Sequence, residues 1–314
     1  MLLTGKSPNK NLPDEKSQDW HFTPDGNPRG YIKPHQLKEL WFHTGTRCNL
    51  SCSFCLEGSS PSSKRLDSPT LEEVKPYVDE ALGLGVEQFS FTGGEPFVIK
   101  DIIKILDYAS QHRPCLVLTN GTTPMIKRLD ELTRLQDNPH PISLRVSLDH
   151  PNAEQHDAGR GDESFATALS GLKLLHEKGF NVSVARHMDK AENTPVVEQA
   201  FRDLFELNGL PVNLKQVAFP DFLPPGALPD VPHVSTDCMT RYQTEESRSL
   251  FMCAFSKMMV KQNGQMQVYA CTLVDDDNEY NLGHDLQASL AKTISMKHHR
   301  CYSCFAFGSS CSEL

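Results

Sequence analysis

The chain has 314 residues and a formal net charge of −9, and 38% of its residues are hydrophobic, which is enough for one large domain and a smaller one. The acidic balance argues against non-specific binding to nucleic acid or to an anionic membrane surface. No apolar stretch approaches the length of a membrane span or resembles a secretory signal, so we expect a cytoplasmic protein.

The first 37 residues are polar, with glycine and proline scattered among charged side chains. We expect residues 1–37 to form an irregular N-terminal arm, which is ordered on the barrel that follows, forms a lid, or is a loose terminus. A short strand is predicted at 40–43. A group of three cysteines follows that strand: Cys48, Cys52 and Cys55.

These three cysteines have a spacing that suits an iron–sulfur cluster. Three residues separate the first pair and two separate the second. Three thiolates this close can bind three irons of a cubane cluster and leave the fourth iron without a protein ligand. Structural zinc sites, the alternative, usually show paired Cys-x-x-Cys motifs. The chain has ten cysteines, and nothing directs it to an oxidising compartment. Cysteines grouped closely in the sequence therefore indicate metal ligands rather than disulfides.

Strands and helices alternate from residue 38 onward. Thr70 and Glu73 form a capping-box pattern before a helix, which Pro76 is expected to kink or to begin. Further helices are predicted at 101–112, 124–136, 164–179 (capped by Ser164) and 194–208. Further strands are predicted at 86–91, 115–119, 142–148, 182–186 and 212–217.

This alternation predicts βαβ units and a parallel sheet. Six units are too few for a closed eight-stranded barrel, so we expect an α/β fold of partial (β/α)6 TIM-barrel type, with a doubly wound sheet as the alternative. In both folds the functional groups lie at the C-terminal ends of the strands. The cysteine loop falls there, and so do a Gly-Gly-Glu turn at 93–95, Asn120, Ser147 and His187.

Five prolines between residues 220 and 232 indicate a linker. We therefore place the partial barrel at 38–219, the linker at 220–235 and a small cysteine-rich α+β module at 236–314. The module contains an Asn-Gly hairpin signal at 263–264 and a second hairpin strand at 268–271. Its cysteines are Cys238, Cys253, Cys271, Cys301, Cys304 and Cys311.

Taken together, the motifs resemble those of the radical S-adenosylmethionine (SAM) superfamily, over roughly residues 38–218. Phe54 lies just before the last cysteine of the triplet, and Gly93, Gly94 and Glu95 match the family's Gly-Gly-Glu motif after the second strand. Three further short segments also match the pattern usual in that family: Ser147-Leu148-Asp149, His156-Asp157 and Arg160-Gly161.

The resemblance implies a 4Fe–4S cluster on Cys48, Cys52 and Cys55, whose open iron chelates the methionine part of SAM. It implies SAM contacts for Gly93, Gly94 and Glu95 (amino group), Ser147 (ribose or carboxylate), Arg160 or Arg186 (carboxylate), and Phe54 and Asn120 (adenine). Structural roles remain open: the two glycines could serve only a tight turn, and Asn120 could be a turn residue. Arg186 and His187 could be ordinary strand-end residues, and Cys115 is expected in the core.

The C-terminal cysteines resemble the twitch module, a shortened SPASM domain with one auxiliary 4Fe–4S cluster. The resemblance assigns that cluster to Cys253, Cys271, Cys301 and Cys304. Cys311 or Cys238 could serve as an alternative ligand, and His298 or His299 could bind a metal as well. A zinc site on the four cysteines is the alternative. A second auxiliary cluster is not expected.

The resemblance implies an enzyme that cleaves SAM reductively to a 5′-deoxyadenosyl radical, which abstracts a hydrogen atom from the substrate. We expect an oxidoreductase-type reaction, a net oxidation or bond-forming step on a small polar molecule in cofactor or natural-product biosynthesis. A flavodoxin or ferredoxin is the expected electron donor. The first alternative is a maturase of a ribosomally made peptide, although the N-terminal arm is short for a leader-binding domain. A carbon-skeleton rearrangement is the next, and a non-catalytic iron–sulfur or zinc protein is the last.

Overall fold

The computed structural model describes residues 16–188, 192–219, 223–308 and 312. In these residues the largest sheet has the strand order β7-β6-β5-β4-β3-β2-β8-β9. The strands β2 to β7 are all parallel, which agrees with the six predicted βα units. Their bounds are Glu39–His43, Gln88–Thr92, Cys115–Thr119, Ile142–Ser147, Asn181–His187 and Gln216–Phe219.

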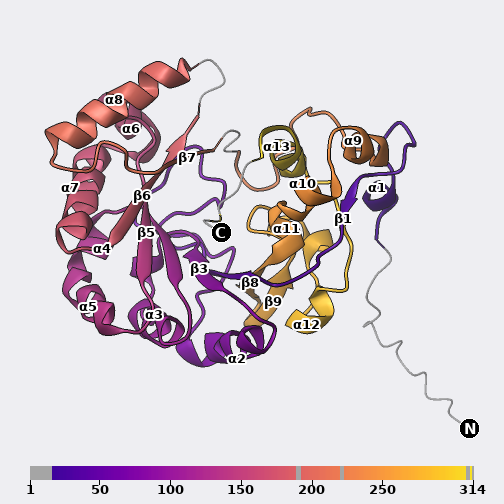
Figure 1. Cartoon of the computed structure of the whole chain (residues 1–314), viewed down its shortest axis with the longest axis horizontal. Helices are drawn as coiled ribbons and strands as arrows, with labels where there is room; N and C mark the ends of the chain where they lie inside the picture. The colour runs from indigo at the N-terminus through magenta and orange to yellow at the C-terminus, as the bar shows by residue number, and fades with distance from the viewer. Residues whose placement is uncertain (1–15, 189–191, 220–222, 309–311, 313–314) are drawn as a thin grey trace, which may run out of the picture.

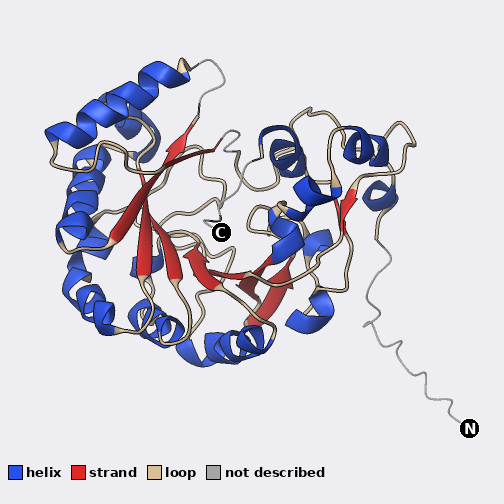
Figure 2. Cartoon of the chain, in the orientation of Figure 1, coloured by secondary structure: helices blue, strands red, loops and turns tan. Residues whose placement is uncertain are grey.

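Helices cover the outer side of this curved sheet, and its inner side faces the C-terminal segment (Figures 1 and 2). A parallel sheet covered in this way is buried on both faces, so its strands are nearly continuous hydrophobic runs. The strand β2 is buried at every position. The covering helices are α2 Leu71–Gly83, α3 Ile102–Ser110, α4 Thr123–Lys127, α5 Leu129–Arg134, α6 Ala153–Arg160, α7 Ser164–Glu177 and α8 Thr194–Leu207.

Several predicted boundaries are wrong in detail. The capping box of α2 is present, but the helix begins at Leu71 and continues through Pro76. Ser164 is the first residue of α7 rather than its cap, because Glu163 takes the N-cap position with a φ of 62°. The helix predicted at 124–136 is divided into α4, α5 and η2 (Leu135–Asp137). The last strand of the barrel begins at Gln216, because a turn occupies 211–214.

The C-terminal segment begins with short helices and then adds a hairpin to the same sheet. Its strands β8 (Ser256–Gln262) and β9 (Gln265–Tyr269) are joined by the expected Asn263-Gly264 turn, where both residues have positive φ. The strand β8 pairs in parallel with β2, which the sequence analysis did not predict. The helices are α9 Thr236–Arg241, α10 Glu245–Ser249, α11 Met252–Phe255, α12 Leu286–Ser289 and α13 His299–Phe307.

The described part of the N-terminal arm lies on the C-terminal segment rather than on the barrel, where the first of our alternatives placed it (Figure 1). Its strand β1 (Tyr31–Ile32) pairs with β10 (Ile294–Ser295). Its helix α1 (Gln18–His21) carries Trp20, whose ring packs edge-on against the Tyr280 ring, with 4.9 Å between the centroids. Two short 3-10 helices complete the fold: η1 (Pro96–Val98) and η3 (Asn278–Tyr280). Among the described helices, none has both the length and the apolar character needed to cross a bilayer.

Candidate active site

The three cysteines of the first loop line one cavity at the C-terminal ends of the parallel strands. Six of the eight residues predicted to bind SAM line it too: Phe54, Gly93, Gly94, Asn120, Ser147 and Arg160. The other two, Glu95 and Arg186, are absent from its described lining. The opposite wall comes from the C-terminal segment, with Thr272, Leu273, Arg300 and Ser303.

The sulfur atoms of this loop receive hydrogen bonds from the protein. The Leu50 N–H donates to Cys48 Sγ at 3.3 Å, and the Ser59 N–H donates to Cys55 Sγ at 3.4 Å. Burial raises the pKa of the Cys48 thiol to about 12 and also raises that of Cys52, so a thiolate there requires a cationic partner. Three convergent thiols with N–H donors fit an iron–sulfur cluster, whose sulfurs accept such bonds.

The Gly-Gly turn packs against the backbone of the cysteine loop. The Gly94 N–H donates to the Gly45 carbonyl at 2.9 Å, and a Cβ at Gly94 would lie 2.2 Å from the Arg47 carbonyl oxygen. Gly93 has a φ of 137°, a conformation that other residues rarely adopt. Both glycines are therefore required for the close approach of two loops, whatever they contact in a ligand.

Glu95 is fully buried, and its carboxylate is engaged within the protein. It accepts hydrogen bonds from the Asn120 N–H at 2.7 Å, the Thr119 hydroxyl at 2.8 Å and the Phe97 N–H at 3.1 Å. Burial raises the pKa of Glu95 to about 7, although these hydrogen bonds act in the opposite direction. In this arrangement Glu95 holds Asn120 at the cavity, and its contact with the SAM amino group remains a prediction.

Both arginines proposed for the SAM carboxylate already have protein carboxylates as partners. Two guanidinium nitrogens of Arg160 donate hydrogen bonds to the Asp149 carboxylate. The guanidinium carbon also lies over the Phe54 ring, 5.5 Å from the ring centroid. Arg186 donates to both oxygens of Glu192, at 2.8 and 2.9 Å. Arg160 still lines the cavity, so it is the better placed of the two. Phe54 also stacks on the His187 ring at 5.7 Å.

Burial acts to lower the pKa of Arg160, but the Asp149 carboxylate outweighs it, so the pKa is raised and the guanidinium stays charged. Asp149 also lines the cavity, yet it was absent from the predicted site residues. The signal was present in the matched Ser-Leu-Asp motif at 147–149, which was interpreted through its serine alone. Asn49 was missed too; its side-chain oxygen accepts a hydrogen bond from Asn120 at 2.9 Å.

The four C-terminal cysteines assigned to the auxiliary site line a second cavity together. Cys253 comes from α11, Cys271 from the loop after β9, and Cys301 and Cys304 from α13. Burial raises the pKa of the Cys301 thiol to about 12 and raises that of Cys253 as well. Four thiols facing one cavity suit either a 4Fe–4S cluster or a zinc ion.

The alternative ligands of this second site are placed differently. Cys238 packs, as Cys253, Cys301 and Cys304 do, against a small apolar cluster, but it is not part of the described lining of the cavity. The cluster consists of Ile32, Val234, Met239, Phe251, Ala254 and Met296. His298 bonds the Asp276 carboxylate at 3.2 Å and accepts the Arg300 N–H at the start of α13, so its ring has a structural role. His299 does not line the cavity in the described residues, and Cys311 lies outside the described residues.

Two residues separate the cavities, because Leu273 and Arg300 line both. The Arg300 guanidinium donates to the carbonyls of Leu273 and Leu223, each at 2.8 Å, and of Leu56 at 3.3 Å. It thereby ties the loop of the first cysteine group to the loop that follows Cys271.

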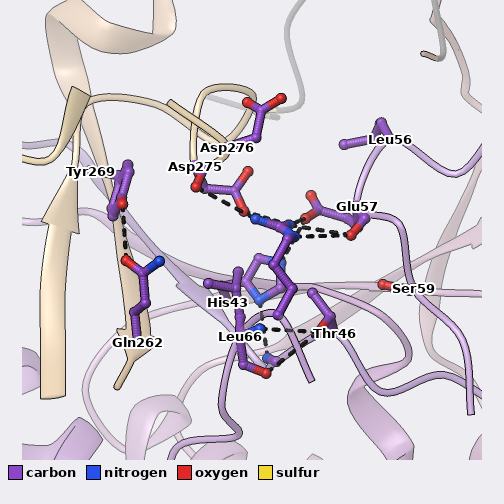
Figure 3. Close-up of polar contacts among 12 residues, drawn as sticks. His43, Thr46, Leu56, Glu57, Ser59, Leu66, Gln262, Tyr269, Asp275 and Asp276 are labelled. Atoms are coloured by element: carbon purple, nitrogen blue, oxygen red, sulfur yellow. Dashed lines mark hydrogen bonds and ion pairs between the residues drawn. The ribbon is translucent and has the colours of Figure 1, made fainter. Parts of the chain in front are cut away.

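A buried charge network also links these two loops (Figure 3). His43 Nε2 lies 2.8 Å from the Glu57 carboxylate, and Arg65 bridges Glu57 at 2.9 Å and Asp275 at 2.7 Å. His43, Glu57 and Asp275 each offer one possible ligand atom, and these three atoms lie within 4.8 Å of one another, as in a metal site. However, His43 Nδ1 accepts the Gly45 N–H at 3.0 Å, which leaves the proton on Nε2, and Arg65 already supplies the positive charge. The network is therefore an ion-pair clamp rather than a metal centre.

Known proteins share this architecture. A sequence model described as the radical SAM superfamily matches residues 42–201. AlbA of Bacillus subtilis, an antilisterial bacteriocin subtilosin biosynthesis protein, is 38% identical over 146 residues, which cover 46% of this chain and 32% of AlbA. The AdoMet-dependent heme synthase of Methanosarcina barkeri is 32% identical over 167 residues, 52% of this chain and 46% of that protein. The mycofactocin maturase MftC of Mycolicibacterium smegmatis is 33% identical over 136 residues, 42% of this chain and 33% of MftC. The matches thus span only a third to a half of these relatives.

Solved structures extend the likeness to most of the chain. Streptococcus suis SuiB bound to SAM matches 82% of this chain and 66% of its own, with a TM-score of 0.61 and 14% identity. The anSMEcpe structure with bound AdoMet matches 83% of this chain and 82% of its own, with a TM-score of 0.58 and 16% identity. At such low identity the structures show a shared fold alone. Because the superfamily model matches half of the sequence and the fold agrees, the chain belongs to the radical SAM superfamily, whose members use SAM and a 4Fe–4S cluster.

Proposed function

We propose that the protein cleaves SAM reductively and abstracts a hydrogen atom from a substrate held between its two cysteine groups. One observation carries this proposal. The three loop cysteines, six predicted SAM contacts and four residues of the C-terminal segment line a single cavity. A cofactor bound on the strand ends would therefore have a second wall opposite it, where a substrate fits.

Each of the following site residues would have a defined role. Cys48, Cys52 and Cys55 would hold the cluster, and the cluster with SAM would supply the one-electron chemistry. Asn120, fixed by Glu95, would face SAM from the end of β4. Arg160, fixed by Asp149, would present the remainder of its guanidinium to the carboxylate. The apolar side chains of the cavity, among them Leu118 and Phe219, would exclude water.

The second cavity would hold a 4Fe–4S cluster on Cys253, Cys271, Cys301 and Cys304. Such a cluster would supply an electron acceptor near the substrate, so a net oxidation of the oxidoreductase type is the reaction that this pair of sites favours. A zinc ion on the same cysteines would give structure without electron transfer.

The substrate that the comparisons favour is a peptide, which was the first alternative in the sequence analysis. AlbA is named for bacteriocin biosynthesis, MftC is a maturase, and SuiB has been solved with its precursor peptide SuiA. A small molecule, as the name of the heme synthase indicates for that relative, is the second candidate. A flavodoxin or ferredoxin in the cytoplasm would deliver the electron.

The test is anaerobic reconstitution with iron and sulfide, followed by incubation with SAM and dithionite. A brown protein that forms 5′-deoxyadenosine supports the proposal, and a colourless zinc protein that forms none contradicts it. A precursor peptide deuterated at its Cα and side-chain positions then separates the substrate classes. Deuterium in the 5′-deoxyadenosine identifies a peptide substrate, and its absence with active enzyme favours the small molecule.

A further inference from the structure

The N-terminal arm closes over the second cysteine site through a pair of aromatic rings. Tyr280 lines the second cavity with the four cysteines, and its hydroxyl lies 3.9 Å from Cys301 Sγ. The Trp20 ring, from α1, packs edge-on against the Tyr280 ring, with 4.9 Å between the centroids. Tyr280 is 0% exposed and Trp20 is 8% exposed. A side chain of the arm therefore shields a residue of the cavity wall from solvent.

The backbone of the arm lies against the same wall. Ile294 and Met296, in and just after β10, line the second cavity. The strand β1 pairs with β10, and the Gly30 carbonyl accepts the Met296 N–H at 2.8 Å. Nearer to the start of the described arm, the Trp20 carbonyl accepts the Ser295 hydroxyl at 2.7 Å. The arm thus forms a second layer behind the part of the wall that contains β10.

Glu279 holds the start of this second layer in place. Its carboxylate accepts the Ser17 N–H at 2.7 Å and the Ser17 hydroxyl at 3.0 Å. The Lys16 ammonium donates to the Glu279 carbonyl at 2.6 Å and lies 4.9 Å from the centre of the Trp20 ring. The Glu279 side chain is 23% exposed, so water competes for these bonds and they can open without unfolding of the core.

We propose that residues 16–22, which we call the arm cover, close the second cysteine site and open when its metal enters or leaves. This inference rests on the second site of the proposed function, but it applies to a zinc ion and to a 4Fe–4S cluster alike. Metal held by buried thiolates exchanges only when water or a chelator reaches it. Its rate of release therefore scales with the fraction of time that the arm cover is open.

The experiment uses the full chain with Cys48, Cys52 and Cys55 replaced by alanine, loaded with zinc alone, so that only the second site is measured. Transfer of zinc to the chromophoric chelator 4-(2-pyridylazo)resorcinol gives the rate of release. Trp20→Ala should release zinc about a hundredfold faster than its parent, because a large buried ring is lost from the arm cover. Glu279→Gln should release it about tenfold faster, because an amide accepts the two Ser17 hydrogen bonds more weakly than a carboxylate.

Asp277→Asn is the matched control, because Asp277 lies in the same loop and also pairs with Lys297, at 3.0 Å. Among the described residues its carboxylate makes no bond to the arm cover, so the rate of release should equal that of the parent. Hydrogen exchange measured on peptides that contain residues 16–22 reports the opening of the cover independently. It should be faster in Glu279→Gln and unchanged in Asp277→Asn.

Release at the parental rate by Trp20→Ala overturns the proposal, as does equally fast release by Asp277→Asn and Glu279→Gln. If Trp20→Ala fails to fold, Trp20→Leu replaces it and is judged in the same way. A parent that binds neither zinc nor iron also overturns the proposal. Cleavage of SAM is assayed separately on the unmodified protein, so failure here leaves the chemistry of the first site standing.

Discussion

The two cysteine groups lie on opposite sides of Leu273 and Arg300, and the chain builds them in different ways. The first is contained in a single loop, 48–55, which a Gly-Gly turn holds from one side. The second draws its cysteines from two helices and a loop, and the hairpin β8–β9, which joins the sheet, lies between the first two of these cysteines in the chain. The comparison teaches that a local sequence motif is enough to bring the first group of cysteines together, whereas the second group depends on the tertiary structure.

The largest expected effect tests the local site. Cys52→Ala should reduce formation of 5′-deoxyadenosine to background, because two thiolates remain where the cluster needs three. The measurement is chromatography of anaerobic reactions with SAM and dithionite. Cys115→Ala is the control, since Cys115 is buried in β4 outside both cavities, and it should retain cleavage. Full cleavage by Cys52→Ala would refute the assignment of the first site.

The next effect tests whether the second site is separate. Replacing both Cys301 and Cys304 by alanine leaves two cysteines at the second site, so it should lower bound iron by about half, from two 4Fe–4S clusters to one, while cleavage of SAM continues in part without product formation. Iron and sulfide analysis of the reconstituted protein measures the first change. An iron-to-protein ratio equal to that of the wild type would argue against a second cluster.

The support of the first site is tested at the glycine turn. Gly94→Ala places a methyl group 2.2 Å from the Arg47 carbonyl, so it should cost about 3 kcal/mol of unfolding free energy, as overpacking does. Urea unfolding gives the value. Gly83→Ala, at the end of α2 with open space around it, should instead be neutral or stabilising. Equal stability of the two variants would contradict the close approach of the loops.

The smallest effect is a pH dependence near the first site. His156 Nδ1 accepts the Asp149 N–H at 3.1 Å, and burial lowers the pKa of His156 to about 4. The folded state disfavours protonation, so this histidine contributes stability above its unfolded pKa of about 6.5, and the contribution is lost as the pH falls from there to about 4.

His156→Gln, whose amide oxygen can accept the same N–H, should remove this dependence. Between pH 7 and pH 5, wild type should lose about 2 kcal/mol more than the variant. Urea unfolding at the two pH values measures the difference. Parallel losses in both proteins would mean that His156 titrates normally in the folded state.

Sequence reasoning recovered much of the fold because its strands are short hydrophobic runs between helices. The bounds of β4 were predicted to the residue, and β2, β3, β5 and β6 within one or two residues at each end. The motif of the first site could be found because its three cysteines are close in sequence. The C-terminal cysteines were grouped through a family resemblance rather than through any local spacing.

What the sequence could not predict depends on partners far along the chain. The pairing of β8 with β2 and the docking of the arm through β1 and β10 are long-range contacts that leave no local pattern. The carboxylate partners of Arg160 and Arg186 are of the same kind, since spacing does not show which acid a buried guanidinium meets. The start of β7 was misplaced because a turn at 211–214 contains apolar residues that resemble a strand.

The position of β2 between β3 and β8 has a consequence for shortened forms of the protein. A fragment that stopped before residue 236 would leave β2 as an outer strand, and the backbone donors and acceptors that now pair with β8 would be open along a strand that is buried at every position in the full chain. An exposed edge strand of this kind can pair with the same strand of another chain, which leads to aggregation. We therefore expect the smallest autonomously folding unit to be larger than the stretch matched by the superfamily model, because the strand that precedes the first cysteines pairs with a strand from the last quarter of the chain.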